Sequence, residues 1–219
     1  MFISNIDLHK HLIEELAFDP SVDERNIAVA VDNGVVTLTG SVPSYAGKLA
    51  AERATKRVRG VLGMAEELTI DLPALHERTD TDLIFSAQQA LRWNSNIPID
   101  AVFVKAENGR LTLSGTLDWQ YQREAARLAA ASIPGVRGVT NDIALRKHVA
   151  VSDIKQKIQD SFRRNAEIDA TRIVVEASGG TVTLSGVVHS WTEREDAAVA
   201  AYSIAGVTDV RNLTTLSLN

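Results

Sequence analysis

The chain has 219 residues, no cysteine, and a formal net charge of −5 from 23 basic and 28 acidic residues. The lack of cysteine excludes disulfide bonds, thiol catalysis and thiolate metal sites. The acidic balance argues against nucleic-acid binding, which depends on basic residues that neutralise phosphates.

The first residues, MFISNIDLHKHLIEEL, carry charges from Asp7 onward and lack the uninterrupted apolar core, roughly 7–15 residues long, of a secretory signal. No apolar run in the chain approaches the roughly 18 residues of a membrane-spanning helix. The chain as given therefore predicts a soluble cytoplasmic protein without a signal peptide, or a periplasmic one if a leader has been removed.

One eight-residue phrase recurs three times. It reads NGVVTLTG at 33–40, NGRLTLSG at 108–115 and GGTVTLSG at 179–186, so the copies lie 75 and 71 residues apart. The same two offsets align the rest of the chain without internal gaps. A complete pattern within so long a period predicts three small domains, at residues 1–72, 78–147 and 149–219.

Each repeat begins with a predicted helix. Apolar residues at a spacing of four mark its buried face in the first and third repeats: Leu8, Leu12 and Leu16, then Ile154, Ile158 and Phe162. An aspartate stands at the same place in each helix: Asp7, Asp82 and Asp153. We interpret these carboxylates as N-caps that accept backbone N–H groups, rather than as a catalytic set.

Two strands joined by a tight turn follow, because NIAVAV and VVTLTGSV flank the hairpin signal Asp32-Asn33-Gly34. Positive φ is predicted at the turn glycines Gly34, Gly109 and Gly180. The last glycine of each phrase is predicted to lie where the strand leaves the sheet, for a bend or the close approach of a helix: Gly40, Gly115 and Gly186. A phosphate-binding loop is the alternative, but it needs clustered glycines that open a helix.

A second helix is predicted at 44–58, 119–133 and 190–204, with an alanine-rich inner face: Ala51, Ala54, Ala126, Ala129, Ala197 and Ala200. Left-handed caps are predicted after it, at Gly60, Gly135 and Gly206. Because this helix connects the last two strands of each domain, we expect those two strands to pair in parallel. The fold class is therefore α+β: three tandem αββαβ domains, each a three-stranded mixed sheet covered by two helices.

The first helix of the middle repeat differs from its counterparts. Its core face is Leu83, Ala87 and Leu91, so Phe85 and Trp93 point elsewhere. The corresponding residues of the other repeats are mostly polar: His9 and Lys155 for Ile84, Lys10 and Gln156 for Phe85, and Phe18 and Arg164 for Trp93.

An aromatic and basic helix face is typical of elements that rest in a membrane interface. We therefore predict that Ile84, Phe85, Arg92 and Trp93 bind an anionic phospholipid surface or a protein partner. Burial of these side chains against a neighbouring domain or a second copy of the chain is the alternative interpretation.

No residue set indicates catalysis, a cofactor or a metal. His9 and His11 are two residues apart on a helix and face different directions, so they are poor joint ligands. The adjacent acids Glu14-Glu15 and Glu66-Glu67 are interpreted as solvated surface, and no loop of oxygen ligands supports an ion sensor. No Ser/His/Asp arrangement has a recognisable context. We predict a protein that is not an enzyme.

The order helix–strand–strand–helix–strand, the phrase NGRLTLSG, the helix openings SYAGKLAAERA and SWTEREDAAVA, and the closing VRGV, IPGV and IAGV resemble the BON domain. That family is named for bacterial osmotically inducible and nodulation proteins, and the resemblance covers all three repeats. It implies a bacterial protein that binds phospholipid or another envelope surface without catalysis. Most such proteins are exported, often with a signal peptide or lipid anchor, and neither is evident here.

Two functions from different classes therefore remain open. One is a peripheral phospholipid-binding protein of osmotic or envelope stress, in which three linked modules add avidity. The other is a soluble protein–protein adaptor or homo-oligomer whose interface includes Phe85 and Trp93.

Overall fold

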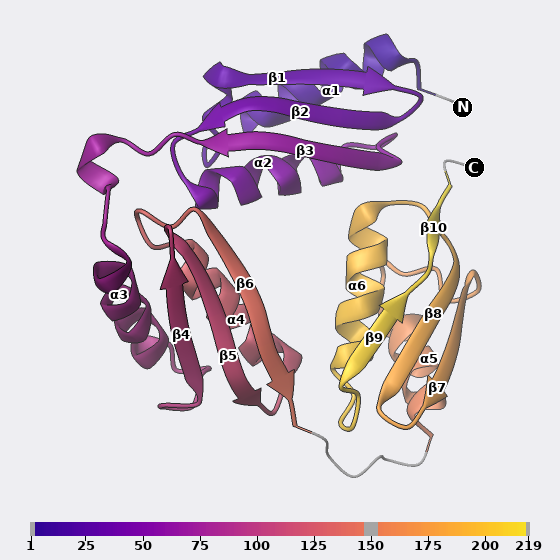
Figure 1. Cartoon of the computed structure of the whole chain (residues 1–219). Helices are drawn as coiled ribbons and strands as arrows, with labels where there is room; N and C mark the ends of the chain where they lie inside the picture. The colour runs from indigo at the N-terminus through magenta and orange to yellow at the C-terminus, as the bar shows by residue number, and fades with distance from the viewer. Residues whose placement is uncertain (1–2, 147–152, 218–219) are drawn as a thin grey trace. The chain divides into compact units, whose positions relative to one another are not determined.

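The computed structural model describes residues 3–146 and 153–217 (Figure 1). Three αββαβ domains follow one another along this chain, each with two helices and its own small mixed sheet. The predicted fold class is thereby confirmed.

The elements repeat in the same order. The first domain consists of α1 (Asn5–Phe18), β1 (Ile27–Asp32), β2 (Val35–Val42), α2 (Tyr45–Arg57) and β3 (Gly63–Ile70). The second consists of α3 (Asp80–Trp93), β4 (Val102–Glu107), β5 (Arg110–Leu117), α4 (Gln120–Ala131) and β6 (Gly138–Leu145). The third consists of α5 (Ile154–Arg164), β7 (Ile173–Ser178), β8 (Thr181–Val188), α6 (Trp191–Tyr202), β9 (Asp209–Asn212) and β10 (Thr215–Leu216).

The second strand of each hairpin is the centre of its sheet. In the first domain β2 pairs antiparallel with β1 and parallel with β3, because α2 carries the chain back across the sheet. The order β4-β5-β6 repeats this arrangement, and β8 pairs with β7, β9 and β10 in the third domain. The last strand of the third domain is thus interrupted, where β3 and β6 are continuous.

Each domain has a core where the apolar stripe of its first helix meets the inner face of its sheet. In the second domain the predicted helix residues Leu83, Ala87 and Leu91 are buried beside Leu111 and Leu113 of β5. The second helices bury alanines at a spacing of four: Ala50 and Ala54, Ala126 and Ala130, Ala197 and Ala201. The predicted Ala129 and Ala200 lie one position off this face and are only half-buried.

The helices α1 and α3 begin earlier than the sequence interpretation placed them. Their N-caps are Ser4 and Thr79, whose hydroxyls accept the N–H groups of Asp7 (3.1 Å) and Asp82 (3.2 Å). The Asp82 carboxylate accepts the Thr79 N–H in return, which completes a capping box. Asp153 does precede α5, but its side chain forms no capping bond. The prediction of aspartate N-caps was wrong for Asp7 and Asp82, because a hydroxyl three residues upstream takes that role.

The glycine that ends each repeated phrase lies inside a strand, not at its end. Gly40, Gly115 and Gly186 have φ values of 116°, 132° and 112°. A Cβ on any of them would overlap the backbone carbonyl oxygen of the residue before the first strand: Asn26, Ala101 and Arg172. The predicted close approach is therefore that of a neighbouring backbone and not of a helix.

The hairpin turns follow the prediction in two domains and differ in the third. Asn33 and Gly34 have φ values of 48° and 80°, and Asn108 and Gly109 have values of 52° and 77°, as expected for a two-residue turn. In the third domain positive φ occurs at Gly179, 58°, and not at the predicted Gly180. The three predicted caps Gly60, Gly135 and Gly206 all have positive φ.

Two polar pairs that sequence spacing did not predict tie helices to neighbouring elements. The Lys48 ammonium on α2 lies 2.8 Å from the Glu66 carboxylate on β3 and donates to the Leu68 carbonyl at 2.7 Å. Glu66 is therefore a structural residue, and its interpretation as solvated surface was wrong. In the third domain Asn212 donates to the Arg194 carbonyl at 2.8 Å and Arg194 donates back to the Asn212 carbonyl at 2.9 Å.

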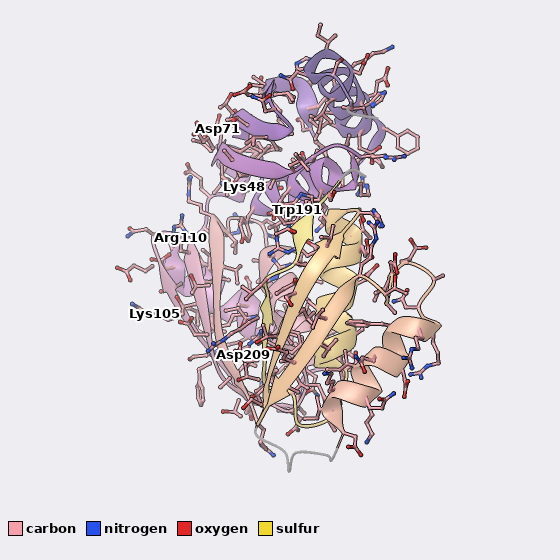
Figure 2. All side chains as sticks on the ribbon, turned by 90° about the vertical axis from the view of Figure 1, so that its right-hand side faces the viewer. Lys48, Asp71, Lys105, Arg110, Trp191 and Asp209 are labelled. Carbon is pink, nitrogen blue, oxygen red and sulfur yellow. The ribbon has the colours of Figure 1, made fainter. Side chains whose placement is uncertain are left out.

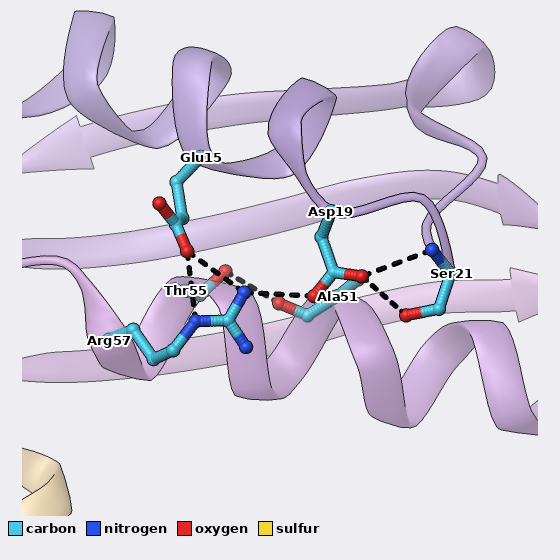
Figure 3. Close-up of polar contacts among 6 residues, drawn as sticks. All are labelled: Glu15, Asp19, Ser21, Ala51, Thr55 and Arg57. Atoms are coloured by element: carbon cyan, nitrogen blue, oxygen red, sulfur yellow. Dashed lines mark hydrogen bonds and ion pairs between the residues drawn. The ribbon is translucent and has the colours of Figure 1, made fainter.

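The Arg57 guanidinium of α2 joins the end of α1 through two carboxylates (Figure 3). Its Nε donates to Glu15 and its Nη2 to Asp19, each at 2.8 Å. Asp19 also accepts the backbone N–H of Ser21 at 3.0 Å and its hydroxyl at 2.5 Å. The bonds from Ser21 and Arg57 lower the pKa of Asp19 from its ordinary value of 3.8 to about 2.

Replacement of Gly40 by alanine should lower the free energy of unfolding of the first domain by about 2 kcal/mol or more, because of backbone strain and the overlap with Asn26. Gly63→Ala is the matched control, since a Cβ there meets its nearest atom at an ordinary 3.7 Å. Chemical denaturation with hydrogen exchange of β1 and β2 amides measures both. Equal losses in the two variants would contradict the close-contact explanation.

Asp19→Asn should make the stability of the first domain less dependent on acid. Because the folded-state pKa is depressed, the contribution of the carboxylate is present above about pH 4 and is lost as the pH falls through about 2. Asparagine retains the turn, since Asn94 and Asn165 accept the same bond from Asn96 and Glu167. We expect the variant to be about 1 kcal/mol less stable at pH 6 and equal to the wild type at pH 2 by chemical denaturation. A gap that is the same at both pH values would refute the assignment.

Candidate functional site

A groove in the second domain lies between α3, the segment after it and the edge strand β4. Its volume is about 620 Å³, within the usual range for ligand-binding clefts. Its lining residues are Phe85, Gln88, Gln89, Leu91, Arg92, Ile97, Pro98, Ile99, Asp100, Val102, Phe103 and Val104. Leu91 and Ile97 are buried core residues, whereas three large apolar side chains of the lining are exposed to solvent.

The three exposed apolar side chains come from different elements. Phe85 is 64% exposed, because the buried stripe of α3 runs through Leu83 and Ala87 on another face. Phe103 is 70% exposed, because residues alternate between the two faces of β4 and its neighbours there, Val102 and Val104, point inward. Ile99 is 73% exposed in the segment between the two elements. The fold thus brings three exposed apolar side chains, from positions 85, 99 and 103, into one groove.

Comparison of the repeats shows that this apolar set belongs to the second domain alone. The corresponding residues are Lys10 and Gln156 for Phe85, Glu24 and Ala170 for Ile99, and Ala28 and Val174 for Phe103. Single exposed apolar residues are common on protein surfaces, but a set that lines one groove marks an interaction site more often than chance exposure does.

The structure separates the four predicted site residues into two groups. Phe85 and Arg92 line the groove. Trp93, the last residue of α3, is 88% exposed outside the lining, and Ile84 is half-buried. Ile99 and Phe103 were missed by the sequence interpretation, although the same repeat offsets that identified Phe85 distinguish them too.

The charged groups at the groove are weakly paired. Arg92 and Asp100 lie 3.5 Å apart with both side chains largely exposed, a geometry that contributes little to stability. On the outer face of β4, the Lys105 ammonium lies 2.9 Å from Glu107, and their hydrogen bond raises the pKa of Lys105. The groove is therefore an apolar surface with amide groups and a balanced rim, which suits binding of an apolar group.

Residues 3–146 and 153–217 contain no group of three or more histidine, aspartate or glutamate side chains placed to hold a metal ion. No helix in these two ranges has the length and apolar character needed to cross a bilayer.

Comparison with known proteins gives one family. The model of the BON domain matches residues 7–71, 79–147 and 150–217. The chain is 30% identical over 127 residues to Osmotically-inducible protein Y of Escherichia coli (strain K12). That match covers 56% of this chain and 63% of the relative, so the chain spans less than two thirds of the relative's length.

Solved structures give distant similarities. The C-terminal domain of CdsD, the structural protein of the Type III secretion system of Chlamydia trachomatis, is 17% identical with a TM-score of 0.27, covering 98% of this chain and 100% of that one. The periplasmic domain of the inner membrane protein PrgH from S. typhimurium is 11% identical with a TM-score of 0.24, covering 89% and 94%.

Because Phe85 and Phe103 are exposed, Phe85→Ser and Phe103→Ser should each change the free energy of unfolding of the second domain by less than about 1 kcal/mol. Leu91→Ala, six residues from Phe85 on the same helix, should cost about 2–5 kcal/mol because it leaves a cavity in the core. Chemical denaturation of the three variants measures the contrast. Large losses in the phenylalanine variants would mean that these side chains are core residues.

Proposed function

This chain belongs to the BON domain family, with three such domains in tandem, and on that premise we propose that it is a non-catalytic bacterial protein of the osmotic or envelope stress response that binds phospholipid surfaces through its second domain. The name of its curated relative, an osmotically inducible protein, supports the stress connection. The surface of the second domain supports the binding role.

The observation that carries the proposal is the set of exposed apolar side chains on and beside α3. Phe85, Ile99, Phe103 and Trp93 are all more than half exposed. Aromatic side chains are favoured at the boundary between headgroups and acyl chains, where a ring can be buried while polar groups stay hydrated. Arg92, which is exposed on α3 next to Trp93, can then meet lipid phosphate.

The residues that line the groove favour a role in ligand binding and not in catalysis. General acid–base catalysis needs a positioned group whose pKa is matched to its task. The titratable groups at this groove, Arg92 and Asp100, form an exposed ion pair on the rim. The remaining lining is apolar or carries the neutral amides of Gln88 and Gln89.

A soluble adaptor or homo-oligomer is the second candidate, and the position of β4 favours it. This strand is at the edge of its sheet and lines the groove, so its outer side can pair with an extended peptide. Light scattering over a range of protein concentrations separates the candidates, because an oligomer grows with concentration and a monomeric lipid-binding protein does not.

Co-sedimentation with vesicles of phosphatidylcholine and phosphatidylglycerol tests the first candidate. The wild type should sediment with the vesicles, and Phe85→Ser/Trp93→Ser should bind at least about tenfold more weakly, because burial of each aromatic ring contributes about 1.5–3 kcal/mol. Phe18→Ser is the matched control: Phe18 stands at the position of Trp93 in the first domain and is 83% exposed.

The control variant should bind as the wild type does. Equal losses in the control and the double variant would show that exposed aromatic residues act nonspecifically. If the wild type remains in the supernatant with every vesicle composition, the lipid proposal is rejected and the same aromatic residues become candidates for a protein interface.

A further inference from the structure

Three arginines of the second domain gather around one short segment, residues 135–138. Arg78 packs over Gly135, where an added Cβ would lie 3.0 Å from the arginine Cγ. Arg137 is in the segment itself, and its backbone N–H donates to the Gly109 carbonyl at 2.8 Å. Arg110 reaches Gly138, where an added Cβ would lie 2.9 Å from Nη1. All three side chains are exposed, and Arg110 projects from the start of β5 (Figure 2).

The residues at the positions of these three arginines are uncharged in the other two domains. The repeat offsets place Ile3, Val35 and Leu62 at these positions in the first domain, and Val149, Thr181 and Thr208 in the third. In the first domain Ile3 packs over Gly60, Val35 against Gly63 and Leu62 over Gly34, which repeats the contacts of the three arginines. The three positive charges are therefore an addition to one copy of a shared architecture.

Carboxylates of the described residues lie near these guanidinium groups but form no direct ion pair with them. Within the part of the chain that the structure describes, none of the three forms an ion pair. Glu77, Asp80 and Asp82 line hollows with Arg78. The Asp80 carboxylate accepts the N–H groups of Asn108 (2.9 Å) and Gly109 (2.8 Å), and the Asp82 carboxylate accepts the Thr79 hydroxyl at 2.7 Å. Arg78 itself donates to the carbonyls of Leu75 and Glu77, each at 2.9 Å, which positions its side chain.

Two of the three arginines line hollows that adjoin the apolar groove. Arg78 and Arg137 line one hollow of about 440 Å³ with Asn108 and Gly109. Arg78 and Phe85 line the next hollow, and Phe85 is also a lining residue of the groove. An anion that meets Arg78 is therefore close to the apolar group that meets Phe85.

We propose that Arg78, Arg110 and Arg137 form a phosphate-binding cluster. Planar guanidinium groups match phosphate oxygens with paired N–H donors, and neighbouring guanidinium groups without ion-pair partners are stabilised by an anionic ligand. The ligand chemistry is a phosphate ester, either the headgroup of an anionic lipid or a soluble phosphate ester. The lipid source rests on the proposed function, since it places the cluster beside the aromatic residues that contact the bilayer.

The test compares two triple variants of equal charge. Arg78→Gln/Arg110→Gln/Arg137→Gln removes the cluster, and Arg25→Gln/Arg163→Gln/Arg211→Gln removes three exposed arginines from the other two domains. Binding to phosphatidylcholine vesicles with and without phosphatidylglycerol is measured at two salt concentrations. The cluster variant should bind anionic vesicles at least about tenfold more weakly, with a smaller salt dependence, and the control variant within about twofold of wild type.

A second measurement uses sn-glycerol 3-phosphate as the soluble probe. Titration into the 219-residue chain, followed by NMR of arginine Nε–Hε groups, should shift the signals of the three cluster arginines saturably and leave those of Arg25, Arg163 and Arg211 unchanged. Circular dichroism melting curves confirm that both variants fold.

The outcomes separate this inference from the proposed function. If the wild type binds anionic vesicles and the cluster variant binds equally well, the cluster is not a phosphate site while lipid binding stands. If the wild type binds no vesicles, the lipid-binding proposal is rejected, and the NMR titration tests the cluster alone. Saturable shifts confined to the three cluster arginines then support a site for soluble phosphate esters. The absence of such shifts overturns the phosphate-binding cluster.

Discussion

Each domain depends on one contact, between a glycine inside its central strand and the backbone carbonyl that precedes its first strand. Gly40, Gly115 and Gly186 allow this approach because a side chain would occupy the position of the carbonyl. The contact fixes the register of the hairpin, as in the pairing of Gly115 with Val102. Since a shift of one residue turns every side chain of a strand to the opposite face, register decides which residues form the core. It also directs Phe103 outward in the second domain, so the groove depends on the same contact.

The fold was largely accessible from sequence because its signals are local and occur three times. Helical spacing of apolar residues identified the buried stripes, and the two-residue turn identified the hairpins. The errors arose where one residue type has several roles. An aspartate suits both the cap and the third position of a helix, and only the hydrogen bonds of Ser4 and Thr79 distinguish the two. The sequence does not distinguish a glycine that packs against a helix from one that packs against a backbone carbonyl, because the contact depends on how the strands pair.

The candidate site was only partly accessible. Phe85 and Arg92 stood out because helical geometry excludes them from the core face of α3. Ile99 and Phe103 lie in a segment without periodicity and on an edge strand, so their nearness to Phe85 is a tertiary property. Glu66 was misjudged for a similar reason. Its sequence context is that of a surface acid, and its structural role depends on Lys48, which is 18 residues away along the chain.

The interrupted last strand of the third domain has a consequence for the chain as a whole. Three sheets of similar sequence on one polypeptide can exchange strands during folding, a common route to misassembly in repeat proteins. A continuous edge strand is the template on which such an exchange begins. In the third domain that edge is divided into β9 and β10, with Leu213 turned out to solvent between them. The division shortens the template in that domain, and so makes it a poorer acceptor for strands of its two neighbours.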